Sequence, residues 1–493
     1  MGKLLGHISS AAACAAALAL TLSAMASMPL LPKPAECRFT GGTCRNATVK
    51  TAIDKSIPPQ GYALSVAPGG ITIKSSDEAG AFYARMTLRQ LETKDAKGKN
   101  VSYPNCEIKD APAFKWRGVM LDEARHFFGK AVVRELLERM AQYKLNVFHW
   151  HLTDNQNWRI EIPEFPELTK RGIWREGRCE SESPLYYTEK DIKEILEFAK
   201  ARHITVVPEI DFPGHLGAAL RAYPQFACGA GKKNILCLGN PEAVAFAEKV
   251  LDRVCGLFPG EVIHIGGDEC PVTNWEKCPK CKALMAREGI GDVKGLQPWL
   301  TRRLAAHLKT KGKRMSGWEE IAVGLGKLDK WGESENLASL LEEYLPPKSS
   351  LVMGYHTKPA ALAANTGFDV VSCPTWHCYF DYQQKLPDDP HRYHRPDIRW
   401  CPLESVYNFD PYEGVNPQAR GRIAGVECCS WTEKTRNVTE LEWKIWPRTL
   451  AFAEVAWRNE EPQKRDFKEF CERAAAHRRR LVAEHVNCAP VGR

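Results

Sequence analysis

The sequence predicts an α/β fold, a (β/α)8 barrel that follows a small N-terminal α+β domain. From about residue 112 onward, short apolar segments typical of buried parallel strands alternate with segments typical of helices. There are eight such apolar segments, which is the number of strands in this barrel. A doubly wound open sheet is the structural alternative, but no glycine-rich phosphate-binding motif follows the first strand.

The first 26 residues are expected to form a secretory signal peptide. Lys3 precedes an alanine- and leucine-rich stretch, and Ala24-Met25-Ala26 has the small-x-small pattern of a cleavage site. No later stretch contains the roughly 18 uninterrupted apolar residues that indicate a membrane span. The mature protein is therefore expected to be exported, to the periplasm or the medium, without a membrane partner.

Residues 33–111 are predicted to form the small α+β domain. The segment "GYALSVAPGGITIKSS" has two alternating runs around Pro-Gly-Gly, a pattern that predicts a β-hairpin. The segment "EAGAFYARMTLRQLET" then has apolar residues at helical spacing. The domain is expected to end near Asp110-Ala111-Pro112.

The barrel is predicted over residues 112–460. Its expected strands are 116–124, 146–154, 204–211, 262–269, 313–320, 350–356, 369–374 and 423–431. Helical segments between them include "KAVVRELLERMAQYK" and "EKDIKEILEFAKARH". Residues 461–493 are interpreted as a C-terminal helix and tail, with no assigned function.

Polar residues follow seven of the eight expected strands. They are Asp122, Arg125, His151, Asp154, Glu209, Asp211, Asp268, Glu269, Glu319, His356, Trp431 and Glu433. The C-terminal strand ends form the catalytic face of a (β/α)8 barrel. Carboxylates beside tryptophans suit a sugar, because aromatic rings stack on a pyranose and acids bind its hydroxyls.

Other chemistries have weaker signals. The net charge of +8 is spread along the chain, which does not favour nucleic acid as a partner. His149, His151, His215 and His264 could bind a catalytic metal, but no HExxH or paired-aspartate motif accompanies them. No GxSxG motif indicates a nucleophilic serine. Glycoside hydrolysis, which needs a proton donor and support for positive charge at the anomeric carbon, fits better.

The chain contains 18 cysteines. Export would permit disulfides, and Cys37/Cys44 and Cys228/Cys237 are plausible local pairs, although connectivity cannot be read from a sequence. Cys278 and Cys281 of "CPKC", with Cys270 nearby, have zinc-knuckle spacing. No second CxxC or HxxxH follows them, so disulfides or free thiols are favoured over structural zinc.

Seven motifs occur in a characteristic order. They are "WRGVMLDEARHFF", "KLNVFHWHLTDNQNWRIEI", "PEIDFPGH", "HIGGDE", "GWEE", "YFDY" and "SWTE". In these motifs the chain resembles the exo-acting β-N-acetylhexosaminidases of glycoside hydrolase family 20, from about residue 60 to 458. The resemblance implies cofactor-free, retaining release of terminal β-linked GlcNAc, with GalNAc as an option, from a glycan. A disaccharide-releasing enzyme of the same family, a catalytically silent sugar-binding protein and a zinc-dependent hydrolase are the alternatives.

The acids of "HIGGDE" receive separate roles from this resemblance. Neighbouring residues of a strand point to opposite faces, so Asp268 and Glu269 cannot simply flank a sugar as nucleophile and acid. In a substrate-assisted mechanism the 2-acetamido oxygen of the sugar attacks the anomeric carbon. Glu269 is then expected to protonate the leaving oxygen, and Asp268 to orient the acetamido group. Gly266 and Gly267 permit the bend.

The resemblance also assigns residues that bind the sugar. Tyr379 is expected to donate a hydrogen bond to the acetamido oxygen. Asp381 and Glu433 are expected to hold hydroxyls at the far end of the sugar, and Arg125 its 3- and 4-hydroxyls. Trp400 is a candidate platform toward the leaving group.

Trp318 and Trp431 are expected to form the walls of the acetamido pocket. Where the family usually has a further pocket tryptophan after the sixth strand, this chain has Tyr355, which is expected to loosen the pocket. Trp331 is an alternative filler, and the small domain is shorter than is common.

Asp154 and His215 are expected to orient the arginine and the acid and to tune the pKa of Glu269. His264, directly before the glycines, is grouped with these supporting residues. The family usually reads Asp-Asp where this chain has Asp154-Asn155, so one negative charge is missing beside the site.

Overall fold

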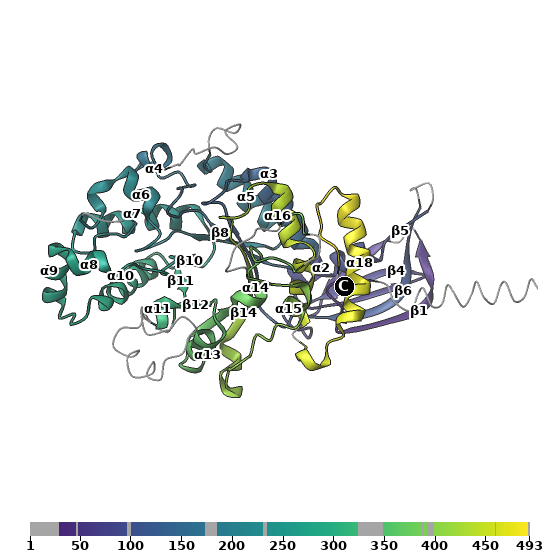
Figure 1. The fold of residues 1–493 in the computed structure, drawn as a ribbon. Helices are drawn as coiled ribbons and strands as arrows, with labels where there is room; N and C mark the ends of the chain where they lie inside the picture. The colour runs from purple at the N-terminus through teal and green to yellow at the C-terminus, as the bar shows by residue number, and fades with distance from the viewer. Residues whose placement is uncertain are drawn as a thin grey trace, which may run out of the picture.

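A closed parallel barrel forms the larger body of the molecule, as the computed structural model shows (Figure 1). The structure describes residues 29–45, 48–95, 100–172, 185–229, 234–323, 349–385, 389–391, 399–458 and 460–491. The expected signal peptide and Trp331 lie outside these residues and stay predictions.

The barrel strands follow each other in sequence order around the barrel. They are β7 (Trp116–Asp122), β8 (Val147–His151), β9 (Thr205–Glu209), β10 (Val262–His264), β11 (Arg314–Trp318), β12 (Leu351–Gly354), β13 (Asp369–Ser372) and β14 (Ile423–Ser430). β14 pairs in parallel with β7 and closes the barrel. Each lies within one of the eight predicted segments, so the predicted fold class is confirmed and the open sheet is wrong.

Helices surround the barrel in the described residues. The longer ones are α3 (Gly129–Gln142), α5 (Glu189–Lys200), α7 (Pro241–Leu257), α9 (Pro279–Glu288), α10 (Leu296–Thr310), α13 (Thr357–Asn365), α16 (Val438–Ile445) and α17 (Arg448–Arg458). The shorter ones are α4 (Glu167–Lys170), α6 (Gly217–Ala222), α8 (Thr273–Lys277), α11 (Glu320–Val323), α14 (Thr375–Cys378) and α15 (Leu403–Tyr407). None of the described helices has the length and apolarity needed to cross a membrane.

Local sequence explains why α5 forms where it does. Thr188 and Asp191 make a capping box at its N-terminus, which satisfies two otherwise unpaired backbone groups. Ile192, Ile195 and Ala199 recur at helical spacing and are buried, so one face of the helix packs on the barrel.

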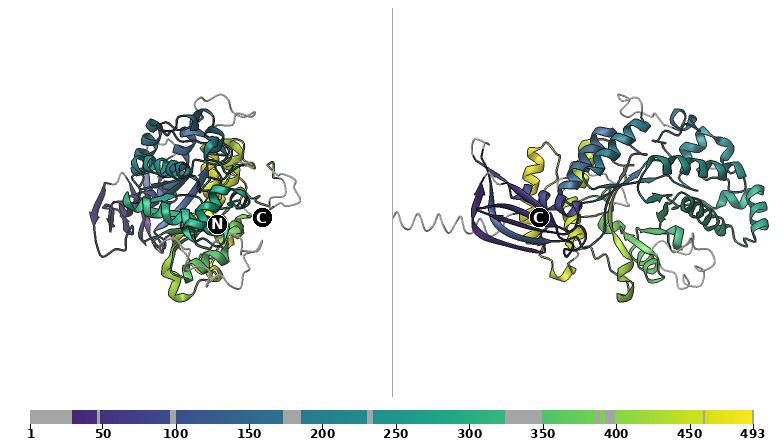
Figure 2. Two further views of the ribbon diagram at one scale, coloured as in Figure 1. Left: turned by 90° about the vertical axis from the view of Figure 1, so that its left-hand side faces the viewer. Right: turned by 180° about the vertical axis from the view of Figure 1, so that it is seen from behind.

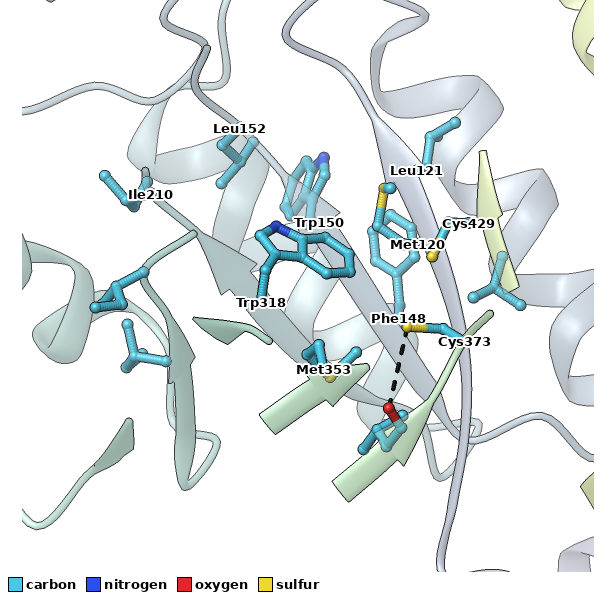
Figure 3. Close-up of a cluster of buried hydrophobic side chains, with 14 of the residues drawn as sticks. Met120, Leu121, Phe148, Trp150, Leu152, Ile210, Trp318, Met353, Cys373 and Cys429 are labelled. Carbon is cyan, nitrogen blue, oxygen red and sulfur yellow. Dashed lines mark hydrogen bonds between the residues drawn. The ribbon is translucent and has the colours of Figure 1, made fainter. Parts of the chain in front are cut away.

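Large apolar side chains pack against the barrel strands (Figure 3). All five residues of β8 are buried, as expected for a strand covered on both faces. Phe148 and Trp150 of this strand contact each other, with ring centroids 5.7 Å apart. This packing holds the strand ends, and the polar side chains that follow them, in fixed relative positions.

The N-terminal body is a twisted sheet in the order β1-β6-β3-β4-β2. Its strands are β1 (Glu36–Arg45), β2 (Val49–Ile53), β3 (Tyr62–Ala67), β4 (Gly70–Ser75), β5 (Thr93–Lys94) and β6 (Val101–Asp110). The predicted hairpin is the antiparallel pair β3–β4, and the predicted helix is α2 (Glu78–Leu91). Sequence patterning did not resolve β1, β2 and β6 individually.

The C-terminal helix α18 (Phe467–Ala483) lies beside the N-terminal sheet in Figure 1 and in the right-hand view of Figure 2. Arg473 of this helix donates to the carbonyl oxygen of Leu30 at 2.9 Å, and Arg480 donates to that of Gln90 in α2 at 3.2 Å. The helix is therefore hydrogen-bonded to the N-terminal domain, far from the C-terminal ends of the barrel strands.

Candidate active site

Four polar residues form one layer at the C-terminal end of the barrel. Asp122 on β7 is in register with His151 on β8, His151 with Glu209 on β9, and Glu209 with His264 on β10. The chain leaves each strand at or just after this layer, so the loops that carry the remaining site residues begin here.

The loop after β10 contains the two adjacent acids. The strand ends at His264, and the φ angles of Gly266, Gly267 and Glu269 are +66°, +95° and +46°. A Cβ atom on Gly266 would lie 1.9 Å from Oδ1 of Asp211, so only glycine fits there. The acids therefore lie in an irregular loop, and the expectation that strand geometry directs them to opposite faces is wrong.

His215 faces both acids. Its Nε2 atom lies 3.6 Å from Oδ2 of Asp268 and 3.6 Å from Oε2 of Glu269. Its Nδ1 atom lies 3.1 Å from Oδ1 of Asp154. Burial opposes the charged imidazole, but the negative charges of Asp268 and Asp154 raise the pKa of His215 well above its usual value. A cationic His215 thus holds three carboxylates together.

The environments of the two acids differ. The Asp268 side chain is 17% exposed, and burial raises its pKa to about 6. The Glu269 side chain is 74% exposed, and its interaction with His215 lowers its pKa. Without a ligand, Glu269 is therefore the stronger acid and is ionised at neutral pH.

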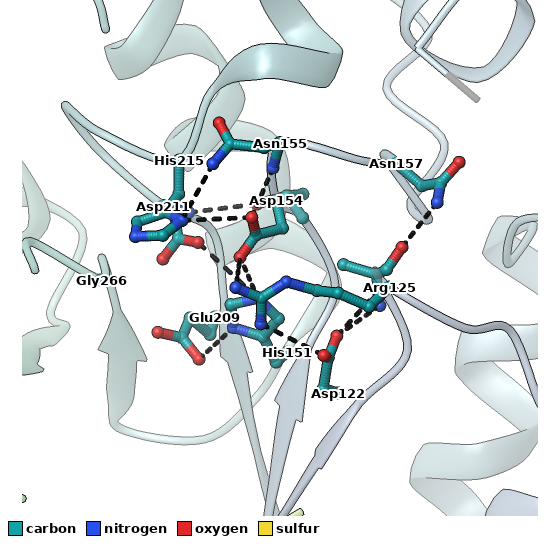
Figure 4. Close-up of polar contacts among 12 residues, drawn as sticks. Asp122, Arg125, His151, Asp154, Asn155, Asn157, Glu209, Asp211, His215 and Gly266 are labelled. Atoms are coloured by element: carbon teal, nitrogen blue, oxygen red, sulfur yellow. Dashed lines mark hydrogen bonds and ion pairs between the residues drawn. The ribbon is translucent and has the colours of Figure 1, made fainter. Parts of the chain in front are cut away.

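Arg125 lies between Asp122 and Asp154 at the barrel mouth (Figure 4). Its guanidinium lies 3.1 Å from Asp122, 2.7 Å from Asp154 and 3.5 Å from Glu433. It also lies over the ring of Trp431, 4.9 Å from the centroid. Because Asp154 contacts both Arg125 and His215, a continuous chain of ion pairs links the arginine to Asp268 and Glu269.

Four aromatic rings form a closed circuit beside the charged group. Ring centroids are 6.0 Å apart for Trp318–Tyr355, 6.4 Å for Tyr355–Tyr379, 6.2 Å for Tyr379–Trp431 and 5.6 Å for Trp318–Trp431. Trp318 is almost completely buried, and its Nε1 donates to Glu209 at 2.7 Å. All four residues were predicted site residues, and the structure brings them together.

Asp381, Glu433 and Trp400 are the remaining predicted sugar-binding residues. Burial, and then the negative charge of Glu433, raise the pKa of Asp381 to about 7. Trp400 is half-buried and pairs with Gln383 through an isolated bridge. Its role as a platform stays a prediction, because residues 392–398 before it lie outside the described residues.

Glu209 is the principal supporting residue that sequence reasoning did not assign. It lies 3.1 Å from His149, 2.5 Å from His151 and 2.9 Å from His264. His264 therefore supports Glu209 through its Nδ1 atom, and is not seen to contact the adjacent acids. The apolar strand that ends in "PEID" was the available signal.

Asp211 and Glu320 are two further buried acids at the site. Neither carboxylate oxygen of Asp211 has a hydrogen-bond partner among the described residues, and burial raises its pKa well above the usual value. Glu320 accepts a short hydrogen bond from the hydroxyl of Tyr355. Burial also raises the pKa of Glu320, so both acids favour the neutral form.

The predicted cysteine pairs are not bonded, since the cysteines of the described residues are free thiols, Cys37 and Cys44 among them. Cys270, a candidate zinc ligand, does not join Cys278 and Cys281. Its sulfur lies 3.6 Å from the carbonyl oxygen of Asp268, and burial raises its pKa well above the usual value. Cys270 therefore packs beneath the loop of the acids.

Comparison with protein families gives two matches that together cover most of the chain. The glycosyl hydrolase family 20 catalytic domain matches residues 114–460. Domain 2 of the same family matches residues 7–111.

Several known proteins are similar over most of this chain. A β-hexosaminidase of Vibrio furnissii is 38% identical over 80% of this chain and 64% of the relative. A β-hexosaminidase of Porphyromonas gingivalis is 34% identical over 85% of this chain and 54% of the relative. The chain thus spans less than two thirds of the length of these two relatives.

Solved structures are similar in fold. A family 20 exo-β-N-acetylglucosaminidase of Vibrio harveyi, in complex with N-acetylglucosamine, has a TM-score of 0.83 and 30% identity, covering 94% of this chain and 79% of that one. A β-N-acetylhexosaminidase of Bacteroides fragilis has a TM-score of 0.80 and 29% identity, covering 94% of this chain and 97% of that one.

Proposed function

The chain belongs to glycosyl hydrolase family 20, and we propose that it is an exo-β-N-acetylhexosaminidase. It removes a terminal, non-reducing, β-linked N-acetylhexosamine from a glycan, with the 2-acetamido group of the substrate as nucleophile. The observation that carries this proposal is the arrangement of Asp268 and Glu269 around His215, beside the circuit of aromatic rings. The names of the relatives support the same activity.

In the first step the acetamido oxygen attacks the anomeric carbon while the bond to the leaving oxygen breaks. Glu269 gives its proton to that oxygen, so the leaving group departs as a neutral alcohol. Asp268 accepts a hydrogen bond from the acetamido N–H and, as an anion, stabilises the positive charge that develops on the oxazolinium ring. The enzyme supplies no covalent nucleophile.

In the second step water attacks the anomeric carbon and the acetamido group is restored. Glu269, now a carboxylate, takes a proton from the water and returns to its acid form. The two inversions at the anomeric carbon give net retention of the β configuration. One residue thus acts as acid and then as base.

The pKa values of the free site fit this cycle once substrate binding is considered. Glu269 is mostly exposed, so a sugar that covers it removes water and raises its pKa toward the value that a proton donor needs. The pKa of Asp268 is about 6, and a hydrogen bond from the acetamido N–H of the bound substrate would lower it. Substrate binding therefore pushes the two acids toward the protonation states that the first step requires.

The aromatic circuit suits the acetamido methyl. Trp318, Tyr355 and Trp431 offer apolar faces, and Tyr379 adds a hydroxyl that can donate to the acetamido oxygen. Arg125, Asp381 and Glu433 supply charged groups for the sugar hydroxyls on the other side. N-Acetylglucosamine in the Vibrio harveyi structure supports GlcNAc as the sugar.

Hydrolysis of aryl glycosides tests the proposal directly. The aryl β-N-acetylglucosaminide should be hydrolysed, and the matching β-glucoside should not, because it has no acetamido nucleophile. Equal turnover of both substrates would contradict substrate assistance. The β-N-acetylgalactosaminide, which differs in the orientation of the 4-hydroxyl, decides whether GalNAc is also a substrate.

A further inference from the structure

Four buried cysteines from two separate loops converge on one point. Cys228 and Cys237 lie in the loop after β9, whereas Cys278 and Cys281 lie at the start of α9, after β10. Their sulfur atoms are all within 4.8 Å of one another. The Sγ–Sγ distances are 3.4 Å for Cys228–Cys281, 3.7 Å for Cys237–Cys278 and 3.9 Å for Cys237–Cys281.

These separations match the edges of a metal–thiolate tetrahedron. With zinc–sulfur bonds of about 2.3 Å, the sulfur atoms of a tetrahedral site lie about 3.8 Å apart. A disulfide would need a sulfur–sulfur distance of about 2.05 Å. All four cysteines are free thiols and at most 6% exposed.

The N-terminus of α9 lies at the cluster, and deprotonated sulfur is the form that binds a metal. Cys278 caps the N-terminus of α9 and Cys281 lies in its first turn, where the helix dipole stabilises a thiolate.

The backbones of the two loops are in contact around the cysteines. A Cβ atom on Gly239 would lie 2.1 Å from the backbone carbonyl of Lys280 and 2.5 Å from the backbone nitrogen of Cys281. Only glycine therefore allows Cys237, two residues earlier, to approach the "CPKC" turn so closely.

We propose that Cys228, Cys237, Cys278 and Cys281 bind one structural Zn²⁺ ion. The four thiolates fill a tetrahedral coordination sphere, which is typical of a structural rather than a catalytic zinc site. The spacing within "CPKC" indicated only half of this site, because the other two ligands come from the preceding barrel loop and replace Cys270.

The ion would cross-link the two loops that carry the catalytic groups. The first loop contains His215 and the second contains Asp268 and Glu269. The loops also touch where Trp275 Nε1 donates to the carbonyl oxygen of Leu236 at 2.9 Å. Zinc would add a second link between the loops, and so fix His215 relative to the two acids. This consequence rests on the proposed function, whereas the metal site itself does not.

Metal analysis of the full chain tests the site without any substrate. Protein purified without chelator should contain about one zinc per chain, and cobalt substitution should give the visible absorption of a tetrahedral thiolate complex. Mapping of the unreduced, alkylated protein should show four thiols that react only after the metal is removed. Disulfides among the four cysteines, or free thiols in zinc-supplemented protein that contains no zinc, would overturn the proposal.

Variants identify the ligands. Cys281→Ser should lose bound zinc and lower Tm, whereas Cys278→His should keep the ion because histidine is also a zinc ligand. Cys255→Ser, on α7 outside the cluster, is the matched control and should keep it too. If Cys281→Ser does not fold, the wild-type metal content and Cys278→His still decide the outcome. Zinc loss in the control alone would contradict the assignment.

Activity measurements test separately whether the ion holds the two loops in position. Folded Cys281→Ser should show kcat/KM about 10- to 100-fold lower than wild type, as for removal of residues that orient a site. An unchanged kcat/KM in the zinc-free variant would show that the ion does not position the catalytic groups, but it would not contradict the metal site itself. An inactive wild type that contains zinc would instead contradict the proposed function alone.

Discussion

The two sides of the barrel mouth are built in different ways. On the charged side, Asp154, His215, Asp268 and Arg125 are held by ion pairs between residues from separate loops. On the aromatic side, Trp318 and its neighbours are held by ring packing. Glu269, on the charged side, is 74% exposed, whereas Trp318 is 1% exposed.

The charged side therefore sets the protonation states that the chemistry needs, and the aromatic side sets the shape of the site. The protonation states of the charged side depend on neighbours at short range, so removal of one partner changes the pKa values of the others. The aromatic side carries no ionised ring, so a substitution there changes fit and affinity. Variants on the charged side should therefore alter kcat and its pH dependence, and variants on the aromatic side should mainly alter KM.

Glu269→Gln should have the largest effect. The amide cannot donate a proton to the leaving oxygen, so kcat for alkyl leaving groups should fall about 10²- to 10⁴-fold. Aryl substrates with acidic leaving groups should be affected less in the first step. Steady-state kinetics with a leaving-group series measure this, with Glu413→Gln, an exposed residue, as control. Equal loss for all leaving groups would remove Glu269 from the role of acid.

Asp268→Asn should follow, with a fall in kcat of about 10²- to 10³-fold from lost stabilisation of the oxazolinium. The wild-type pKa of Asp268 is about 6, and its ionised form is the active one. kcat/KM should therefore decrease as the pH falls below about 6, and this decrease should vanish in the variant. A pH–rate profile checks both expectations. If kcat/KM of Asp268→Asn still decreases at acid pH (the acid limb of the profile), the decrease belongs to another group.

His215→Ala should have an intermediate effect, about 10- to 100-fold on kcat. The positive charge of His215 lowers the pKa of Asp268, so its removal should raise that pKa. The acid limb of kcat/KM should then move to higher pH, a shift that a merely structural role would not produce. If the acid limb of kcat/KM does not move in His215→Ala, His215 does not control the pKa of Asp268 through their ion pair.

Tyr355→Phe should have the smallest effect. The ring stays in the aromatic circuit and only the hydrogen bond to Glu320 is lost, which corresponds to a change of about two- to tenfold in KM. The acid limb should not move. A large fall in kcat with unchanged KM would show that the aromatic side takes part in the chemistry and would break the comparison.

Much of the barrel and part of the site could be predicted because their signals are local in sequence. All eight strands were found from apolar runs, and Trp318 and Trp431 follow directly from strand-end motifs. The opposite-face argument for Asp268 and Glu269 was wrong because two left-handed glycines end the strand early. Glu209 was noticed as a strand-end acid, yet its partners His149, His151 and His264 come from two other strands.

The sequence by itself determined the fold class, the order of the motifs and the residue types at the barrel mouth, because strand periodicity and short motifs depend on neighbours along the chain. Only the tertiary structure decided how charges are shared around His215, which carboxylate is buried, and which cysteines meet. Cys228 and Cys281 are 53 residues apart in sequence, yet their sulfurs lie 3.4 Å from each other. Such pairings and their pKa values arise from distances in space, which a folded barrel fixes and a linear pattern does not encode.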